Sequence, residues 1–229
     1  MSDRFPTLTI ARRILAEEGV WTALARGAGL VQRKLVSGGR FFIYEHDLQA
    51  WREEDFRPRV AQLEVRRVQS NAEADALPPH WDPRPFFLTG RRRLDVGATA
   101  FCLSVAREFA HAGWTAETPE AKALVDCVPF RVDFAHGEAC TGGTWTRPKF
   151  RGLGLMVYSY YLRLEHLRQR GYRRSRNAVE VDNVASQKAH ARFAPRVCAV
   201  GRYVRVGRWE YWRERPLTTP SSCRKLRSR

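Results

Sequence analysis

A glycine turn between residues 144 and 155 constrains this chain more than any other stretch of its sequence. Thr144–Thr146 is typical of the end of a strand, Pro148 marks a loop, and Arg151-Gly152-Leu153-Gly154 leads into a long amphipathic helix. Small side chains let a ligand approach the backbone, and the first N–H groups of a helix have no partner within the helix. Because basic residues flank the glycines, the turn predicts a cradle for a phosphate-bearing, nucleotide-like cofactor, and hence an enzyme.

Two hydrophobic periods occur on either side of this turn. Gln62–Val68 alternates apolar and polar residues, as a half-buried strand does, whereas Leu153–Leu167 steps by three and four residues until Gly171. Arg163 lies off the apolar stripe of that helix. Gly142-Gly143 within a strand predicts a bulge or the close approach of another group. Further strands are expected at 41–48, 98–105, 109–115, 135–146, 177–181, 197–205 and 208–213. The sum of these elements is a mixed α+β fold.

The N-terminal part of the chain has a different pattern. Residues 7–36 predict two amphipathic helical pieces with basic residues on their other faces. Such a helix can rest on an anionic membrane surface, but packing on its own domain is the simpler interpretation. The charged, proline-terminated segment Trp51–Pro58 is a candidate boundary. We therefore expect an N-terminal helical extension with one strand at 1–57, a main domain at 58–215 and a basic tail at 216–229.

Composition limits the classes of protein to which the chain can belong. Forty basic against 24 acidic residues give a formal net charge of +16, which favours anionic partners. The charge is scattered along the chain, so it does not indicate a specific nucleic-acid site. There is no apolar run of about 18 residues and no apolar segment of a secretory signal at the start. The five cysteines form no Cys-x-x-Cys pair, so we expect no structural metal and a cytoplasmic protein with reduced thiols.

The order of elements around the glycine turn narrows the type of cofactor. The chain has no Gly-x-x-x-x-Gly-Lys-Ser/Thr loop and no early Gly-x-Gly-x-x-Gly. A strand ending at Thr146, the turn, a long helix, a short strand, Asn183 and a short helix follow one another. This succession resembles the GNAT superfamily of acyl-CoA-dependent N-acyltransferases. Their signature is Gln or Arg, two residues, Gly, one residue, then Gly or Ala; Gly152 and Gly154 match it, and Lys149 stands at its first position.

The resemblance covers about residues 60–213, is most specific over 138–193, and does not account for residues 1–57. It implies a mainly antiparallel, twisted sheet flanked by helices. It also implies acetyl-CoA or another acyl-CoA as co-substrate, an amine-bearing acceptor and no metal.

The resemblance places the cofactor residue by residue. The pantetheine arm would pair with the backbone of Trp145 and Thr146, Asn183 would touch the same region, and Ser186 would lie near the thiol. Asn183 is also a plain candidate for a helix cap. The pyrophosphate is expected on the glycine turn, at the positive end of the helix dipole, against these residues: Lys149, Phe150, Arg151, Gly152, Leu153, Gly154 and Leu155.

Catalysis in the family is usually direct attack of an amine on the thioester in a ternary complex, which requires a base. Glu138 lies on the strand before the glycine turn, where a general base of the family often resides, so the resemblance implies this role for it. Its small, apolar sequence neighbours would raise the pKa of its carboxyl group. The alternative is a glutamate that faces solvent or pairs with arginine. His190, seven residues after Asn183 where many members have Tyr, is expected to protonate the leaving thiolate. Three other side chains could act in catalysis, but neither spacing nor a partner group in the sequence assigns a role to them: His111, His136 and Cys140.

Two other functions stay open on the sequence. One is an aminoacyl-tRNA-dependent transferase of the same fold, and the other is a non-catalytic or membrane-associated binding module that uses residues 7–36. The acceptor would be recognised by early loops, expected at 71–93 and 117–126, which carry no recognisable motif. Neither the acceptor nor the oligomeric state is predicted.

Overall fold

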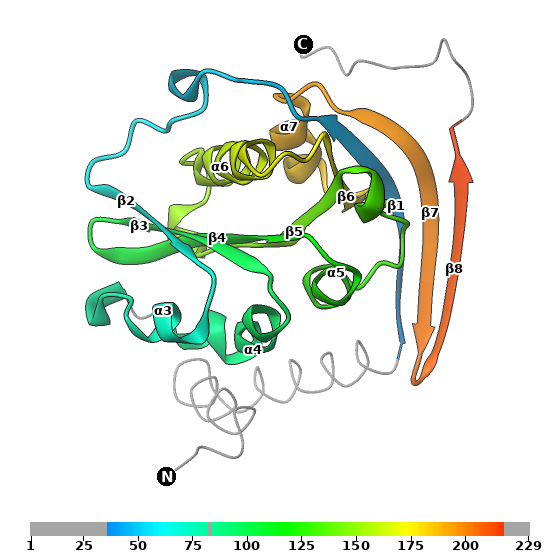
Figure 1. Cartoon of the computed structure of the whole chain (residues 1–229), viewed down its shortest axis with the longest axis horizontal. Coiled ribbons are helices and arrows are strands. Elements are labelled where there is room, and N and C mark those ends of the chain that lie inside the picture. Colours follow the sequence, from blue (N-terminus) through cyan, green and yellow to red (C-terminus); the bar gives the residue numbers. More distant parts are fainter. Residues whose placement is uncertain (1–35, 82–83, 218–229) are drawn as a thin grey trace. The chain divides into compact units, whose positions relative to one another are not determined.

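The computed structural model describes residues 36–81 and 84–217, and its main feature is an eight-stranded sheet (Figure 1). The strands lie in this order across the sheet: β2 (Leu63–Val68), β3 (Thr99–Val105), β4 (Glu108–Ala116), β5 (Glu138–Thr146), β6 (Arg174–Glu180), β1 (Val36–Asp47), β7 (Arg196–Val206) and β8 (Trp209–Pro216). The described pairings are antiparallel, apart from the parallel pair β5–β6. The predicted α+β class with a mainly antiparallel sheet is confirmed.

The chain divides into two compact units. Among the described residues, the larger unit lies within 40–201 and 214–217, and the smaller comprises residues 36–39 and 202–213. In the smaller unit, β7 and β8 are joined at Gly207, whose φ of 59° is one that glycine tolerates best. Trp209 and Tyr211 are exposed there and stack with their ring centroids 6.0 Å apart.

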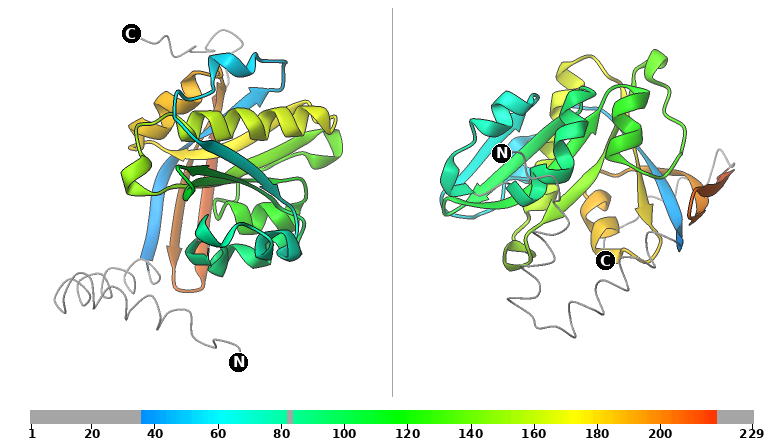
Figure 2. Two further views of the ribbon diagram at one scale, coloured as in Figure 1. Left: turned by 90° about the vertical axis from the view of Figure 1, so that its left-hand side faces the viewer. Right: turned by 90° about the horizontal axis from the view of Figure 1, so that it is seen from below.

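In the part of the chain that the structure describes, five α-helices accompany the sheet: α3 (Asn71–Asp75), α4 (Arg84–Asp95), α5 (Pro119–Val125), α6 (Leu155–Gln169) and α7 (Val184–Ala191). In the views of Figures 1 and 2, α6 covers one face of strands β2–β5, while α3, α4 and α5 cover the other. Neighbouring residues of β4 show both layers, since Gly113 faces Arg163 of α6 and Trp114 faces Gly90 of α4. The alternation of side chains along a strand produces this arrangement.

The core on the α6 side is rich in aromatic rings. Phe56 stacks on Tyr161 and on Phe193, with ring centroids 5.4 and 4.6 Å away. Leu155 and Leu164 of α6 pack into the same cluster and are fully buried. Because the segment around Phe56 covers the outer side of α6, this helix is buried on a wider arc than one apolar stripe suggests.

Two segments that we expected to be loops are helical, so that prediction is wrong. The side chain of Ser70 accepts a hydrogen bond from the amide of Glu73 at the start of α3, and Thr118 accepts one from Ala121 at the start of α5. Pro119 occupies the first turn of α5, where its missing N–H costs nothing. Ser and Thr before such positions are ordinary start signals for helices.

β1 lies inside the sheet, between β6 and β7. Its residues Phe41 to Asp47 pair antiparallel with Glu180 to Arg174 of β6. The one strand expected in the N-terminal extension is therefore an integral part of the sheet. The helices expected at 7–36 fall outside the described residues, except that β1 starts at Val36. Nearly all of the tail at 216–229 also lies outside them. The domain boundaries stay predictions.

Candidate functional site

The site begins where β5 and β6 separate. Their parallel pairing covers Glu138 to Cys140 against Arg174 to Arg176, and none is described beyond it, although both strands continue. On its other side β5 pairs with β4, and this register shifts between Ala112 and Trp114. The expected bulge at the paired glycines is thereby confirmed: three steps along β5 oppose two along β4.

Gly143 makes the bulge possible. Its φ is +56°, and a Cβ atom there would lie 2.7 Å from Cδ1 of Trp114 and 2.8 Å from Nη1 of Arg93. Both the backbone conformation and the available space therefore require glycine. The bulge lies just past Cys140, where the described pairing of β5 with β6 ends.

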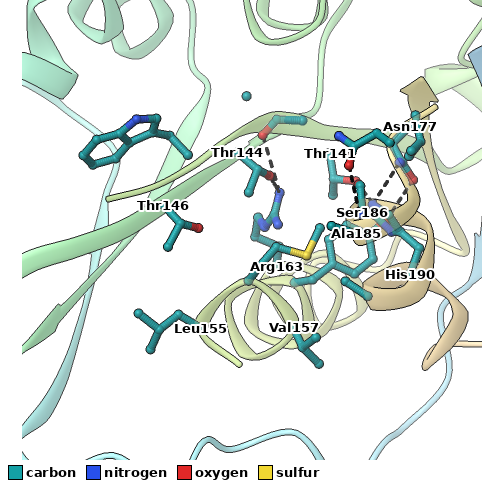
Figure 3. Close-up of a pocket in the computed structure, with 18 of the residues that line it drawn as sticks. Thr141, Thr144, Thr146, Leu155, Val157, Arg163, Asn177, Ala185, Ser186 and His190 are labelled. Atoms are coloured by element: carbon teal, nitrogen blue, oxygen red, sulfur yellow. Dashed lines mark hydrogen bonds between the residues drawn. The ribbon is translucent and has the colours of Figure 1, made fainter. Parts of the chain in front are cut away.

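A cavity of about 830 Å³ opens between the separated strands (Figure 3). Its walls come from the second half of β5, the glycine turn, the first turn of α6, the end of β6 and one side of α7. This volume is that of a small-molecule or cofactor pocket. No group of three or more His, Cys, Asp or Glu side chains suited to a metal ion occurs among the described residues.

The glycine turn presents backbone amides at one end of this cavity. The amides of Phe150 and Arg151 are already bonded, to Arg147 O at 2.9 Å and Pro148 O at 3.2 Å. Those from Gly152 to Val157 have no backbone acceptor within the described part of the chain. The free donors are thus placed one or two residues later than the sequence suggested, at the start of the 15-residue helix α6.

The positive φ values of Gly152 (+80°) and Gly154 (+78°) shape this turn. A Cβ atom on Gly152 would have no atom within 4 Å, so its surroundings are open. Arg151 lines the cavity and has no carboxylate partner among the described residues, whereas Lys149 forms an ion pair with Glu108. Lys149 and the exposed Leu153 do not line the cavity.

Trp145 and Thr146 both line the cavity at the end of β5. The Trp145 ring stacks on Phe109, with centroids 6.1 Å apart, and is partly exposed. The Thr146 hydroxyl lies 2.8 Å from Nδ1 of His111, and burial lowers the pKa of this imidazole to about 3. His111 is therefore neutral at pH 7.

Three predicted residues come from α7 and the residue before it. Asn183 accepts a hydrogen bond from the amide of Ser186 at 3.0 Å and so caps the helix, as the alternative interpretation held. Asn183, Ser186 and His190 all line the cavity. Burial lowers the pKa of His190 well below its ordinary value. A neutral imidazole lacks the extra proton expected of an acid, so the surroundings of His190 do not favour that role.

A buried chain of hydrogen bonds ends at His190. Ser175 donates to Thr141, Thr141 donates to Tyr160, and Tyr160 donates to Asn177 at 3.3, 3.1 and 3.0 Å. The Asn177 amide nitrogen then lies 3.4 Å from Nε2 of His190 (Figure 3). The chain connects β5, α6, β6 and α7 at the base of the cavity. Tyr160 lies on the apolar stripe of α6, so its place in the sequence gives no sign of this polar role.

Glu138 does not line the cavity. The prediction of apolar surroundings for its carboxyl group is also wrong. Its carboxylate lies 3.5 Å from Arg174 and 3.3 Å from Arg176, and it accepts a hydrogen bond from the Asp133 amide at 2.8 Å. These arginines follow it by more than thirty residues and reach it through the β5–β6 pairing. His136 is likewise outside, exposed and paired with Asp133.

Asp126, at the end of α5, is the one acidic side chain among the described residues that line the cavity. It approaches from the face opposite to α6, and a Cβ atom on Gly142 would lie 3.6 Å from its Cβ. One carboxylate oxygen accepts a hydrogen bond from the Val128 amide at 2.9 Å. Burial raises the pKa of this carboxyl group, against the opposing effects of Val128 and Lys122. No sequence pattern singled it out.

Arg163, also missed, is a fully buried cation on α6. Nε donates to Ser159 O at 3.2 Å, and Nη1 donates to Gly142 O at 3.4 Å and Thr144 Oγ1 at 3.2 Å. No carboxylate pairs with it in the described residues. Burial lowers its pKa to about 10, so it remains charged at neutral pH. Its expected place off the buried face is wrong, since the absence of a side chain at Gly113 leaves room for it.

No protein-family model and no curated protein sequence matches this chain. Solved structures do resemble it. One, from Novosphingobium aromaticivorans and assigned to the GNAT acetyltransferase family, is 11% identical, with a TM-score of 0.48, over 73% of this chain and 63% of that one. A tandem GNAT protein from the clavulanic acid biosynthesis pathway is 14% identical, with a TM-score of 0.45, over 80% and 55%. A functionally unknown protein from Staphylococcus epidermidis is 12% identical, with a TM-score of 0.46, over 80% and 65%.

Structures assigned to the GNAT superfamily are thus among the neighbours, as the sequence resemblance predicts. The chain spans less than two thirds of the length of each of these three proteins. Within residues 36–81 and 84–217, no helix combines the length and the apolar character of a bilayer-spanning segment.

Proposed function

We propose that this chain is an acyl-CoA-dependent N-acyltransferase that transfers an acyl group, acetyl in the simplest case, to an amine. One observation carries the proposal: a single cavity joins the gap between two diverging parallel strands to the free amides at the start of α6. An anion at the amides and an extended arm in the gap are the two features of coenzyme A that such a cavity suits.

The cofactor would bind in two parts. Its pyrophosphate would accept hydrogen bonds from the amides of Gly152 to Val157, with Arg151 nearby. The pantetheine arm would lie along the edge of β5 that β6 leaves unpaired past Cys140. An exposed strand edge offers alternating N–H and C=O groups, which the amides of pantetheine can satisfy as an added strand would.

The reaction would occur where the strands part. The amine nitrogen attacks the thioester carbon, the C–S bond breaks with its electrons going to sulfur, and the amine proton passes to a base. Asp126 is the carboxylate that lines the cavity, and burial raises its pKa, which makes it a better proton acceptor than an ordinary aspartate. The thiol of CoA resembles that of cysteine, with a pKa of about 8.5, so it can leave as a thiolate without an acid. Ser186 lies on the wall where it can donate to the sulfur.

The test uses two matched glycine substitutions, Gly152→Glu and Gly171→Glu, which lie before and after α6. Both glycines have positive φ (+80° and +86°), and neither has an atom within 4 Å of an added Cβ, so the strain is matched. Isothermal titration with acetyl-CoA and CoA should give at least tenfold weaker binding for Gly152→Glu alone. A glutamate at a helix N-terminus is favourable to the dipole, so the loss would not reflect a weaker fold.

The same titration separates the other functions. Wild-type protein that binds neither ligand at millimolar concentration would refute the proposal, as would equal losses in the two variants. Nuclease-sensitive transfer from charged tRNA without CoA binding would point to the aminoacyl transferase instead. Partner binding that survives without any cofactor would point to a non-catalytic module.

A further inference from the structure

Thr144 and Arg163 form a polar pair at the point where β5 bends (Figure 3). Thr144 follows Gly143 in the bulge, is exposed, and lines the cavity. Nη1 of Arg163 donates to its hydroxyl oxygen at 3.2 Å and to the carbonyl oxygen of Gly142 at 3.4 Å. Figure 3 shows the guanidinium and the Thr144 hydroxyl facing each other beside the cavity.

The chemistry of the two groups determines the direction of the hydroxyl proton. A guanidinium has donors and no acceptor, so the Thr144 oxygen must accept in this contact. The hydroxyl hydrogen is then left for another acceptor, and none is present among the described residues. Donation from a charged group also polarises the hydroxyl, which makes it a stronger donor in turn. Thr144 therefore offers a directed O–H donor to whatever occupies the cavity.

The position of Arg163 makes this donor rigid. The guanidinium is fully buried, is held by three hydrogen bonds, and lies against Gly113, where any side chain would collide with it. Its charge has no carboxylate partner in the described part of the chain. In a site with low dielectric constant, an uncompensated fixed cation acts strongly on negative charge that develops nearby.

We propose that the Thr144 hydroxyl, held by Arg163, binds the carbonyl oxygen of the acyl thioester and stabilises the oxyanion of the tetrahedral intermediate. This inference rests on the proposed function. As the amine forms the N–C bond, the π electrons of the carbonyl move to its oxygen, which Thr144 then holds through the hydroxyl hydrogen. When the carbonyl re-forms, the C–S bond breaks and its electrons leave on sulfur. Thr144 is thus a catalytic residue, and Arg163 is a positioning residue.

The test needs no knowledge of the acceptor. Acetyl-CoA labelled with carbon-13 at the carbonyl is bound to the protein, and the thioester C=O stretch is recorded by isotope-edited infrared spectroscopy. In wild type the band should lie at lower frequency than in water, because a hydrogen bond weakens the C=O bond. Thr144→Val, which has the same shape without the donor, and Thr144→Ala should lose this shift, whereas Thr144→Ser should keep it. Arg163→Met should reduce it.

Thr115→Val is the matched control for the infrared band, because Thr115 is a threonine of the neighbouring strand β4 and does not line the cavity. CoA without an acyl group should bind every Thr144 variant with a Kd within about threefold of that of wild type. Without an acceptor amine, hydrolysis of acetyl-CoA by water releases acetate and the CoA thiol. This hydrolysis should be slower by roughly 10²-fold in Thr144→Val, the usual effect of removing one oxyanion donor.

The outcomes separate the two proposals. A wild-type protein that binds neither CoA nor acetyl-CoA would refute the acyltransferase assignment itself. If both bind but the band is the same in wild type, Thr144→Val and Thr144→Ala, only the role of Thr144 is refuted. An equal change in Thr115→Val would refute it as well, because the shift would then not belong to the Thr144 hydroxyl.

Discussion

Replacing Gly113 by alanine should push Arg163 out of its position. The added Cβ atom would lie 2.7 Å from Cζ, 2.9 Å from Nη1 and 3.0 Å from Nε of Arg163. The guanidinium has little freedom to withdraw, because Nε is bonded to Ser159 O and Nη1 to Gly142 O and Thr144 Oγ1. The methyl group must therefore displace either these hydrogen bonds or strand β4.

The cost follows from that collision. Overpacking of a filled core by one methyl group lowers the free energy of unfolding by about 1–3 kcal/mol. A hydrogen bond to a charged group is worth a similar amount, roughly 1.5–3 kcal/mol, if one is lost instead. For a chain of this size each kcal/mol lowers Tm by about 2–4 °C. We expect Gly113→Ala to melt roughly 2–12 °C below wild type.

Thermal melts of a double-mutant cycle test the cause. In an Arg163→Met background the space beside Gly113 holds a more adaptable side chain, so Gly113→Ala should cost at least about 0.5 kcal/mol less than in wild type. An unchanged Tm for the single variant would contradict the collision. An identical cost in both backgrounds would show that the methyl group clashes with something other than the guanidinium.

Two further predictions concern titratable groups. Asp126→Asn should slow acyl transfer and remove the acidic limb of the pH profile of kcat/KM. Glu138→Gln, whose site lies outside the cavity, should retain that limb and lower the free energy of unfolding by about 1–3 kcal/mol through its buried contacts. An acidic limb that survives in Asp126→Asn would exclude Asp126 as the base. Burial lowers the pKa values of His46 and His111 to about 3 in the folded state, against about 6.5 in the unfolded state. Between pH 6.5 and pH 3 the unfolded state therefore binds more protons, so the free energy of unfolding falls as the pH drops from 6.5. Urea denaturation at pH 5 should give a free energy of unfolding about 2 kcal/mol lower per histidine than at pH 7, and equal values at the two pH values would show that these imidazoles do not stay neutral in the fold.

Local sequence patterns account for much of the framework of the site. The apolar periods placed β2 and α6, the adjacent glycines indicated the β5 bulge, and the glycine turn marked the start of α6. Asn183 caps α7 as its side chain and position suggested. These features depend on residues within a few positions of one another, so a single sequence contains the information that they need.

The chemistry inside the cavity depends on contacts between distant segments. Glu138 seemed apolar in its surroundings because Arg174 and Arg176 come from another strand, and Arg163 seemed solvated because periodicity cannot show what covers the second side of a helix. Asp126 reaches the cavity only through the packing of α5 on the opposite face of the sheet.

The sequence by itself therefore determined the glycine turn and the strands and helix on either side of it. Only the tertiary structure decided which charged groups enter the cavity. The physical reason is that backbone conformation at glycines and caps is a local property, whereas the burial and pairing of a charge depend on strand register and layer packing across more than thirty residues of chain.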